Sequence, residues 1–200
     1  MKHTIICIGR QYGSGGREIG ELVAKTLGIA YYDKKLITLA AQKSGLSDEF
    51  IANNEQRVRS GFMQNLAASA AYSSGFFSSQ YLPLSESIFI SEAQVIRDIA
   101  AKESAVIVGR CADYILQDKA KCLKVFIHAD MAFRAKRIVE VYGEREQSPE
   151  QRLRDKDKRR AAYHRFYTDM KWGDARNYHI ALDSGALGID KCADMIASLY

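Results

Sequence analysis

The sequence predicts an α/β protein with one parallel β-sheet that is covered on both faces by helices. Short apolar runs alternate with segments of helical periodicity along most of the 200 residues, and each crossover between parallel strands places its helix over the sheet. The runs are continuously apolar, which is typical of strands buried on both faces. We therefore expect about five strands in a single sheet.

The first 33 residues predict a strand, a loop, a helix and a second strand, in that order. The first strand covers residues 4–8, a β-branched apolar run that ends at Gly9. The helix starts at Arg17, and Gly28 stands at its C-terminal cap. The second strand covers residues 29–32. A glycine-rich loop therefore connects a buried strand to a helix.

The middle of the chain gives fewer structural signals. Residues 46–51 are typical of a capped helix start. Residues 60–87 are rich in Ser, Ala, Gly and aromatic side chains, carry almost no charge and predict no particular element. A helical pattern at 87–102 then leads into a continuous apolar strand at 105–109.

The C-terminal part returns to alternating strands and helices. A strand is expected at 123–127 and a helix at 131–142, which Gly143 ends. Ser148-Pro149-Glu150-Gln151 opens the next helix, with a capping box and a proline in its first turn. The last strand is expected at 179–182, before an amphipathic helix at 189–196.

Composition favours a single compact domain over residues 1–200, because 47% of the residues are hydrophobic. No apolar run approaches the roughly 20 residues of a membrane-spanning helix, and we predict no signal peptide and no membrane partner. The four cysteines lack zinc or disulfide spacing, which fits a cytoplasmic location. The formal net charge of +5 indicates polyanionic partners, and charge alone does not choose among nucleotides, nucleic acid and a membrane surface.

The glycine-rich loop covers residues 9–18 and precedes the first helix. Such a loop exposes backbone N–H groups at the positive end of the helix, where phosphate oxygens bind well. Taken alone, the same glycines also fit a tight turn that needs positive φ angles. The loop is therefore a candidate phosphate site, and the sequence motifs on either side of it are needed to choose between the two interpretations.

The loop and its flanking sequence motifs resemble those of the cytidylate kinases, and more closely those of the bacterial group called cytidylate kinase-like. Four motifs match at fixed spacing without a gap, namely Ile6-Cys7-Ile8, Gly13-Ser14-Gly15, Leu27-Gly28 and Tyr31-Tyr32-Asp33. Later matches are Val108-Gly109-Arg110, Lys124 to Ile127, Arg134 to Arg137, the charged run Arg154 to Arg160, and Leu182-Asp183-Ser184. The resemblance covers residues 4–33 and 106–196 and is absent between 34 and 102.

The resemblance implies a P-loop kinase-like fold, with ATP and Mg²⁺ as cofactors and nucleotides as partners. It implies a variable acceptor-binding segment at 34–102 and a basic lid at 144–168. The implied nucleotide-binding residues are Gly13, Ser14, Gly15, Gly16, Arg17 and Glu18. The implied catalytic residues are Arg17, Asp33, Arg154 and Arg160, and the implied acceptor-binding residues are Asp33, Arg110, Asp157 and Arg160.

The loop also departs from the family pattern at three positions. Gly16 stands where the family has its phosphate-binding lysine, and Arg10 replaces the first loop glycine. Glu18 stands where a hydroxyl would ordinarily ligate Mg²⁺; its carboxylate could ligate the ion directly or through water, or favour the helix end electrostatically. Our sequence-based hypothesis is that Arg17 replaces the lysine, because a guanidinium offers paired donors to phosphate.

The basic run has two interpretations. Between 144 and 165 the chain carries eight Lys or Arg against five acidic residues, which suits a lid over phosphates and equally a solvated helix face. Asp33 is likewise both a candidate acceptor contact and a candidate helix N-cap. Arg110, directly after a buried strand, is expected at the carboxyl edge of the sheet, where ligands gather.

Three functions remain open from the sequence. The first is a nucleoside monophosphate kinase that acts on a CMP-like or other small phosphate acceptor. The second is a non-catalytic nucleotide-binding regulator with a degenerate P-loop. The third, a nucleic-acid binder, is disfavoured because no known nucleic-acid-binding motif accompanies the charge. The oligomeric state is left open, a homodimer included.

Overall fold

The computed structural model describes residues 4–33, 39, 84–119, 121–143 and 148–200. The chain divides into two compact units, one of residues 1–33 and 97–200 and the other of residues 34–96. In the second unit the described residues are 39 and 84–96. The predicted helix start at 46–51, most of the segment 60–87 and the beginning of the predicted lid lie outside the described residues.

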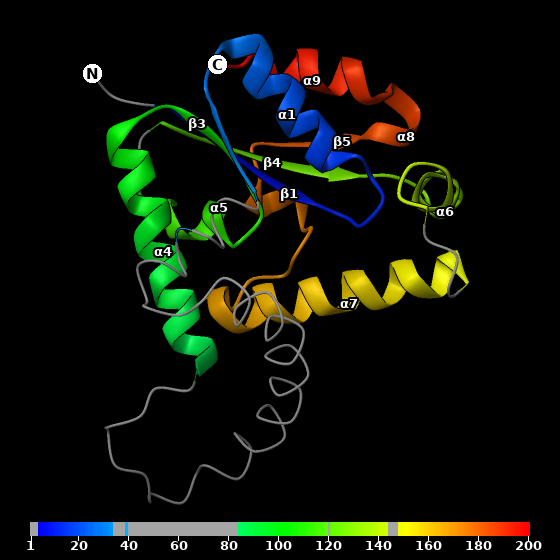
Figure 1. Cartoon of the computed structure of the whole chain (residues 1–200), viewed down its shortest axis with the longest axis horizontal. Helices are drawn as coiled ribbons and strands as arrows, with labels where there is room; N and C mark the ends of the chain where they lie inside the picture. The colour runs from blue at the N-terminus through cyan, green and yellow to red at the C-terminus, as the bar shows by residue number, and fades with distance from the viewer. Residues whose placement is uncertain (1–3, 34–38, 40–83, 120, 144–147) are drawn as a thin grey trace, which may run out of the picture. The chain divides into compact units, whose positions relative to one another are not determined.

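The first unit contains a five-stranded parallel sheet, as Figure 1 shows. The strand order is β2-β3-β1-β4-β5, so β1 lies in the centre. The strands are β1 (Ile5–Arg10), β2 (Ala30–Tyr32), β3 (Ala105–Val108), β4 (Cys122–His128) and β5 (Ile180–Asp183). The predicted sheet is confirmed, and each strand coincides with one of the five apolar runs.

Five helices confirm periodic segments of the sequence. They are α1 (Gly16–Leu27), α4 (Leu84–Lys102), α6 (Met131–Glu140), α7 (Pro149–Thr168) and α9 (Ile189–Ala197). Gly28 caps α1 in the left-handed conformation with φ 64°, as predicted. The short elements α5 (Ala112–Ile115), η1 (Ala175–Asn177) and α8 (Ser184–Leu187) were not predicted, because one helical turn is too short to show a periodic pattern.

Helices cover the sheet on both faces (Figure 1). Helices α1 and α9 lie side by side over one face, and α5 and α7 lie on the other side. The main core forms where α1 and α9 meet the strands, and its fully buried members include Ile6, Ile19 and Ile196. Gly20 allows α1 to approach the sheet closely, because a Cβ there would lie 2.9 Å from Val108 Cγ2. This packing fixes the position of the glycine-rich loop.

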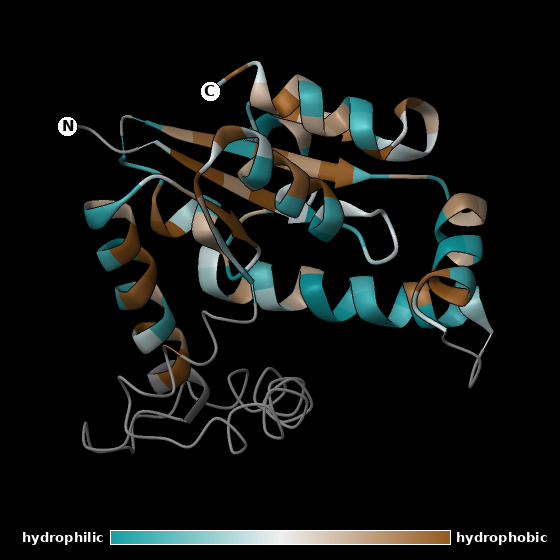
Figure 2. Ribbon diagram, turned by 45° about the horizontal axis from the view of Figure 1, so that its top comes forward, coloured by the Kyte–Doolittle hydropathy of each residue, from teal (hydrophilic) through white to brown (hydrophobic). Residues whose placement is uncertain are grey.

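Helix α7 differs from the core helices in its polarity. Figure 2 shows apolar strands in brown and a largely hydrophilic α7 in teal. Three of its residues are buried, namely Leu153, His164 and Thr168. Near its C-terminal end, His164 Nε2 lies 3.3 Å from Asp113 Oδ2 of α5, and Thr168 Oγ1 lies 3.1 Å from His164 Nδ1. Polar contacts therefore hold much of this helix in place.

Within the described part of the chain, no helix combines the length and the apolar character needed to cross a membrane. All four cysteines are buried and free, and the sulfur atoms of Cys7 and Cys122 lie 3.4 Å apart.

Candidate functional site

The glycine-rich loop connects β1 to α1 at the carboxyl edge of the sheet. Gly13 and Gly15 adopt φ angles of 77° and 75°, which favour glycine. Helix α1 begins at Gly16, so the backbone N–H groups around residues 15–18 belong to its first turn and have no intrahelical partners. Among the described residues, these four N–H groups donate to no protein acceptor. The loop therefore presents donors at the positive end of α1, as the sequence predicted.

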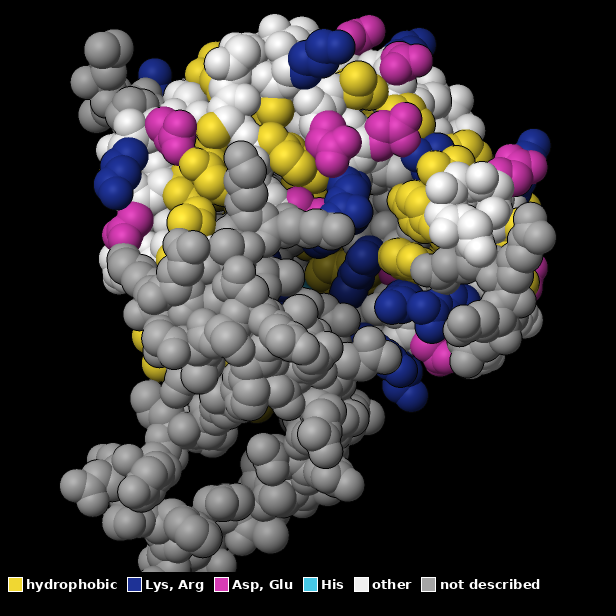
Figure 3. Space-filling view, in the orientation of Figure 1, with side chains coloured by type: hydrophobic (Ala, Val, Ile, Leu, Met, Phe, Trp, Pro, Cys, Tyr) yellow, Lys and Arg dark blue, Asp and Glu magenta, His cyan; other side chains and the backbone are white. Residues whose placement is uncertain are grey.

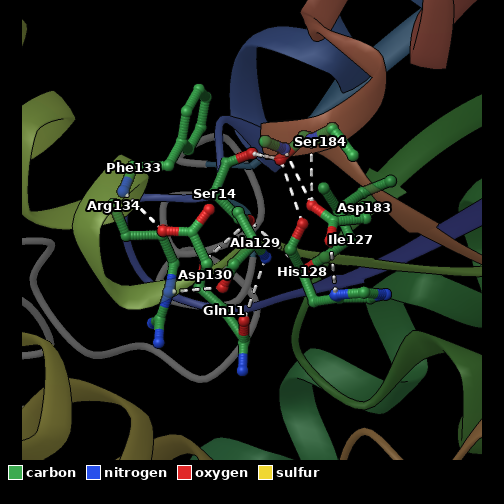
Figure 4. A network of polar contacts seen from close by, with 12 residues as sticks. Gln11, Ser14, Ile127, His128, Ala129, Asp130, Phe133, Arg134, Asp183 and Ser184 are labelled. Atoms are coloured by element: carbon green, nitrogen blue, oxygen red, sulfur yellow. Dashed lines mark hydrogen bonds and ion pairs between the residues drawn. The ribbon is translucent and has the colours of Figure 1, made fainter.

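Two buried serines hold the loop against the sheet, as Figure 4 shows. Ser14 Oγ donates to Gln11 O at 2.9 Å and to Ile127 O at 3.2 Å. Ser184 Oγ, from the start of α8, donates to Ser14 O at 2.6 Å and to His128 O at 3.1 Å. Ser14, which the sequence assigns to nucleotide binding, thus has its hydroxyl turned into the protein, and its backbone N–H contacts Gln11 O at 3.4 Å.

Replacing Ser184 by alanine is expected to destabilise the fold by about 1–3 kcal/mol, because it removes the side-chain donor to the carbonyl oxygen of the buried Ser14. Ser198→Ala is the matched control, since the Ser198 hydroxyl is exposed and donates to Met195 O at 2.8 Å; we expect its effect to stay within about 0.5 kcal/mol. Denaturant unfolding of both variants measures the difference. Equal stabilities would contradict the proposed support of the loop.

A cluster of arginines surrounds Asp33, which directly follows β2. Arg17 Nε donates to Asp33 Oδ2 at 2.6 Å, and Arg10 Nη2 lies 3.9 Å from Asp33 Oδ1. Burial lowers the pKa of Arg10, an effect that Asp33 opposes and the positive charges of Arg110 and Arg17 reinforce. Burial alone would lower the pKa of Arg17, but the charge of Asp33 and its hydrogen bond raise it. Arg10 and Arg17 contact Asp33, and Arg110 adds a third positive charge close to Arg10, so the cluster carries an excess of positive charge that attracts anions.

Arg110 belongs to an unusual turn at the carboxyl end of β3. Gly109, Arg110 and Cys111 have φ angles of 82°, 60° and 55°. The left-handed conformation costs a non-glycine residue about 1–3 kcal/mol, and such outliers concentrate at functional sites. The turn places Arg110 beside the loop that follows β1, where the sequence predicted it.

The basic helix α7 binds the glycine-rich loop through Asp157. Its carboxylate accepts the backbone N–H of Tyr12 at 2.7 Å and pairs with Arg134 Nη1 of α6 at 2.6 Å. The Arg134 side chain is only 6% exposed and also donates to Tyr12 O at 3.2 Å and Ala129 O at 3.0 Å. Asp157 and Arg134 therefore fix both polar groups of the Tyr12 backbone.

Arg160 makes the second connection between α7 and the loop. Its Nη1 donates to Arg10 O at 3.0 Å, and its guanidinium carbon lies 5.1 Å from the centre of the Tyr12 ring. Lys156 Nζ lies 5.7 Å from the same centre. Figure 3 shows Lys and Arg side chains gathered in the region between α1 and α7. The positive charge of α7 is therefore directed, at these residues, toward the loop.

Glu18 forms an ion pair with Arg137 of α6. The Glu18 side chain is 49% exposed, whereas Arg137 is 13% exposed and its Nε has no hydrogen-bond partner among the described residues. A metal ion bound directly to Glu18 would lie next to this guanidinium. Water-mediated ligation suits the arrangement better than direct ligation.

The structure brings together most, but not all, of the side chains predicted from the sequence. Arg17, Asp33 and Arg110 lie around the Arg10 side chain, and Asp157 and Arg160 contact the loop. Arg154 is exposed on α7 and has no hydrogen bond or ion pair among the described residues. The predicted site roles themselves stay predictions.

Sequence reasoning assigned no role to Arg134, Ser184 or Tyr12. Arg134 and Ser184 lie within stretches that matched the family pattern, which is a signal that could have identified them. Nothing in the local sequence distinguishes Tyr12 as the residue that α7 contacts.

A model of the cytidylate kinase-like family matches residues 5–186, which includes the loop, the arginine cluster and α7. The chain belongs to this family. A crystal structure of an uncharacterized protein from Eubacterium ventriosum ATCC 27560 is similar to this chain, with 30% identity and a TM-score of 0.70, and the match covers 98% of each chain. No curated protein matches the sequence.

More distant structures place this family member among P-loop kinase folds. A gluconokinase from Sinorhizobium meliloti 1021 has a TM-score of 0.56 at 16% identity, over 99% of this chain and 93% of that one. A shikimate kinase from Acinetobacter baumannii in complex with shikimate has a TM-score of 0.54 at 16% identity, over 98% and 92%. At this identity the likeness concerns the fold, a helix-flanked parallel sheet, and leaves the substrate undecided.

Proposed function

We propose that this cytidylate kinase-like protein is a kinase that transfers the γ-phosphoryl group of ATP to a CMP-like nucleoside monophosphate or another small phosphate-bearing acceptor. The observation that carries the proposal is the convergence of cations on the loop. Arg10 and Arg17 contact Asp33 beside the first turn of α1, Arg110 lies close to Arg10, and Arg160 contacts the loop from α7. Phosphoryl transfer needs in-line positioning and positive charge more than covalent chemistry.

Each group has a role in this proposal. The backbone amides of residues 13–18 bind the ATP phosphates at the N-terminus of α1. Arg110 binds the phosphate group of the acceptor, and Asp33 orients the acceptor so that an oxygen of that phosphate attacks the γ-phosphorus and ADP leaves. Arg154 and Arg160 stabilise the charge of the transition state, and Arg160 also binds the acceptor. Asp157, whose oxygens already bind Tyr12 and Arg134, contributes by holding the loop in place. The excess of arginine over carboxylate in the Asp33 cluster supports an anionic acceptor.

Mg²⁺ would neutralise charge on the transferring phosphates when bound. The described chain offers Glu18 for it, and the Arg137 ion pair leaves that carboxylate half-exposed. We propose that the ion is held mainly by the nucleotide phosphates, with Glu18 contributing through water.

A second function is favoured by two observations in the glycine-rich loop. Glu18 stands at the position of the metal-ligating hydroxyl and is already paired with Arg137, and Gly16 supplies no cation. A protein that binds nucleotide without turnover would tolerate both changes. The alternative is therefore a regulatory nucleotide-binding protein with the kinase fold.

A coupled assay of ADP release, run over a panel of nucleoside monophosphates with ATP and Mg²⁺, separates the two functions. We expect turnover with a pyrimidine nucleoside monophosphate. Titration calorimetry with ATP completes the test, because tight binding without ADP release on any acceptor would support the regulator. Absence of both binding and turnover would contradict both proposals.

A further inference from the structure

We propose that Arg10 is the side chain that replaces the missing P-loop lysine and binds the phosphate groups of the nucleotide. The inference rests on the proposed nucleotide site and differs from the sequence-based hypothesis, which assigned this role to Arg17. It follows from the space that the Arg10 side chain occupies.

The stem of Arg10 lies across Gly16, the position of the family lysine. A Cβ atom at Gly16 would lie 2.5 Å from Arg10 Cβ and 3.0 Å from Arg10 Cγ. Real Cβ atoms essentially never approach other atoms this closely, so a lysine at 16 and the arginine at 10 exclude each other in this arrangement. The two departures from the family pattern are therefore one exchange, in which a side chain disappears at Gly16 and another enters the same space from Arg10.

The guanidinium of Arg10 lies against Gly109 at the end of β3. A Cβ atom at Gly109 would lie 2.0 Å from Arg10 Nη1 and 3.0 Å from its Cζ. The glycine thus leaves room for the guanidinium at the carboxyl edge of the sheet, between the loop and the turn that carries Arg110. Here Arg10 lies beside the first turn of α1, where the phosphates of the nucleotide are proposed to bind.

The donors of this guanidinium are largely unused among the residues that the structure describes. Among the described residues, the Arg10 side chain forms one ion pair, with Asp33 at 3.9 Å, and this distance is longer than a hydrogen bond. The Arg10 side chain makes no hydrogen bond to any described residue. The side chain is 21% exposed. A largely buried cation with free donors is poorly satisfied, and a phosphate group would supply the missing acceptors in paired geometry.

Arg17 is less suited to the same role. Its side chain is 47% exposed, and its Nε already donates to Asp33 at 2.6 Å. Arg17 therefore orients the carboxylate, while Arg10 keeps its donors for a ligand. The backbone of Arg10 is also fixed, because its carbonyl oxygen accepts a hydrogen bond from Arg160 at 3.0 Å.

Calorimetric titration with ATP and Mg²⁺ of Arg10→Gln, Arg17→Gln and Lys25→Ala tests the assignment. Lys25 is exposed on α1, the helix that follows the loop, and serves as the control. We expect Arg10→Gln to weaken ATP binding about 10- to 100-fold, because it loses charged hydrogen bonds to the phosphates. Arg17→Gln should weaken ATP binding less, and Lys25→Ala should leave it unchanged. Unchanged binding by a folded Arg10→Gln, or a larger loss in Arg17→Gln, would overturn the inference.

The double variant Arg10→Gly/Gly16→Lys keeps the test decisive if Arg10→Gln fails to fold. It restores the family arrangement, so we expect it to bind ATP within about tenfold of the natural protein. Gly16→Lys alone should bind much more weakly, because Arg10 occupies the space. A double variant that binds no better than either single variant contradicts the exchange. If the natural protein itself binds no ATP, the proposed function fails together with the Arg10 assignment. If the natural protein binds ATP but Arg10→Gln binds it equally well, only the Arg10 assignment fails.

Discussion

Arg160→Ala is expected to lower kcat by about 10³, within the range measured when an arginine that stabilises a phosphoryl-transfer transition state is removed. Arg160 reaches the loop from α7, donates to Arg10 O at 3.0 Å and stacks over Tyr12. An interaction made mainly in the transition state affects kcat, whereas ground-state binding affects KM. We therefore expect the KM for ATP to change by less than about threefold.

The neighbouring Arg159 provides the matched control, because it is exposed on the same helix and carries the same charge. Arg159→Ala should retain nearly full turnover. Thermal unfolding is measured in parallel, since a purely structural Arg160 would lower the Tm and raise KM with little change in kcat. If Arg160→Ala has the same kcat as the natural protein, Arg160 has no part in the proposed mechanism.

Asp157→Ala is expected to lower the free energy of unfolding by about 3–5 kcal/mol, because it leaves a buried charge without its partner. That charge is Arg134, which is 6% exposed and pairs with Asp157 at 2.6 Å. The backbone N–H of Tyr12 loses its acceptor in the same variant. In a protein of this size the Tm should fall by roughly 2–4 °C for each kcal/mol.

Asp155→Ala is the control for Asp157→Ala, since Asp155 lies on the same helix and accepts a hydrogen bond from Gln151 Nε2 at 3.0 Å near the surface. We expect its effect to stay below about 1 kcal/mol. The double variant Arg134→Ala/Asp157→Ala should lose less stability than the sum of the single variants, because the two side chains form one unit. Additive losses would show that Arg134 and Asp157 stabilise the fold independently.

Local sequence patterns predicted the sheet and its helices because those elements are defined by apolar periodicity. The run that forms β1 is continuously apolar, and Ile5 to Ile8 are all at most 1% exposed. Gly28 ended α1 in the sequence as it does in the structure. The helices α5 and α8 have four residues each, which gives too little periodicity to predict.

The sequence predicted the loop and the positions of several site residues, but it did not predict the long-range contacts between them. The glycine-rich loop and the carboxyl-edge positions of Asp33 and Arg110 follow from strand order and motif spacing. The Tyr12 to Asp157 hydrogen bond joins residues 145 positions apart, and no local pattern specifies such a pair. Arg10 was visible only as a departure from the family pattern, because its proposed role depends on the space left by Gly16 at the start of α1 and by Gly109 after β3.

The polarity of α7 has a consequence for how this helix would open. Since Leu153, His164 and Thr168 are its buried residues, detaching it exposes little apolar surface. Such an event should depend weakly on urea and carry a small heat-capacity change, while ionic strength should promote it. Amide hydrogen exchange in α7 should therefore accelerate with added salt at concentrations where the central strands stay protected.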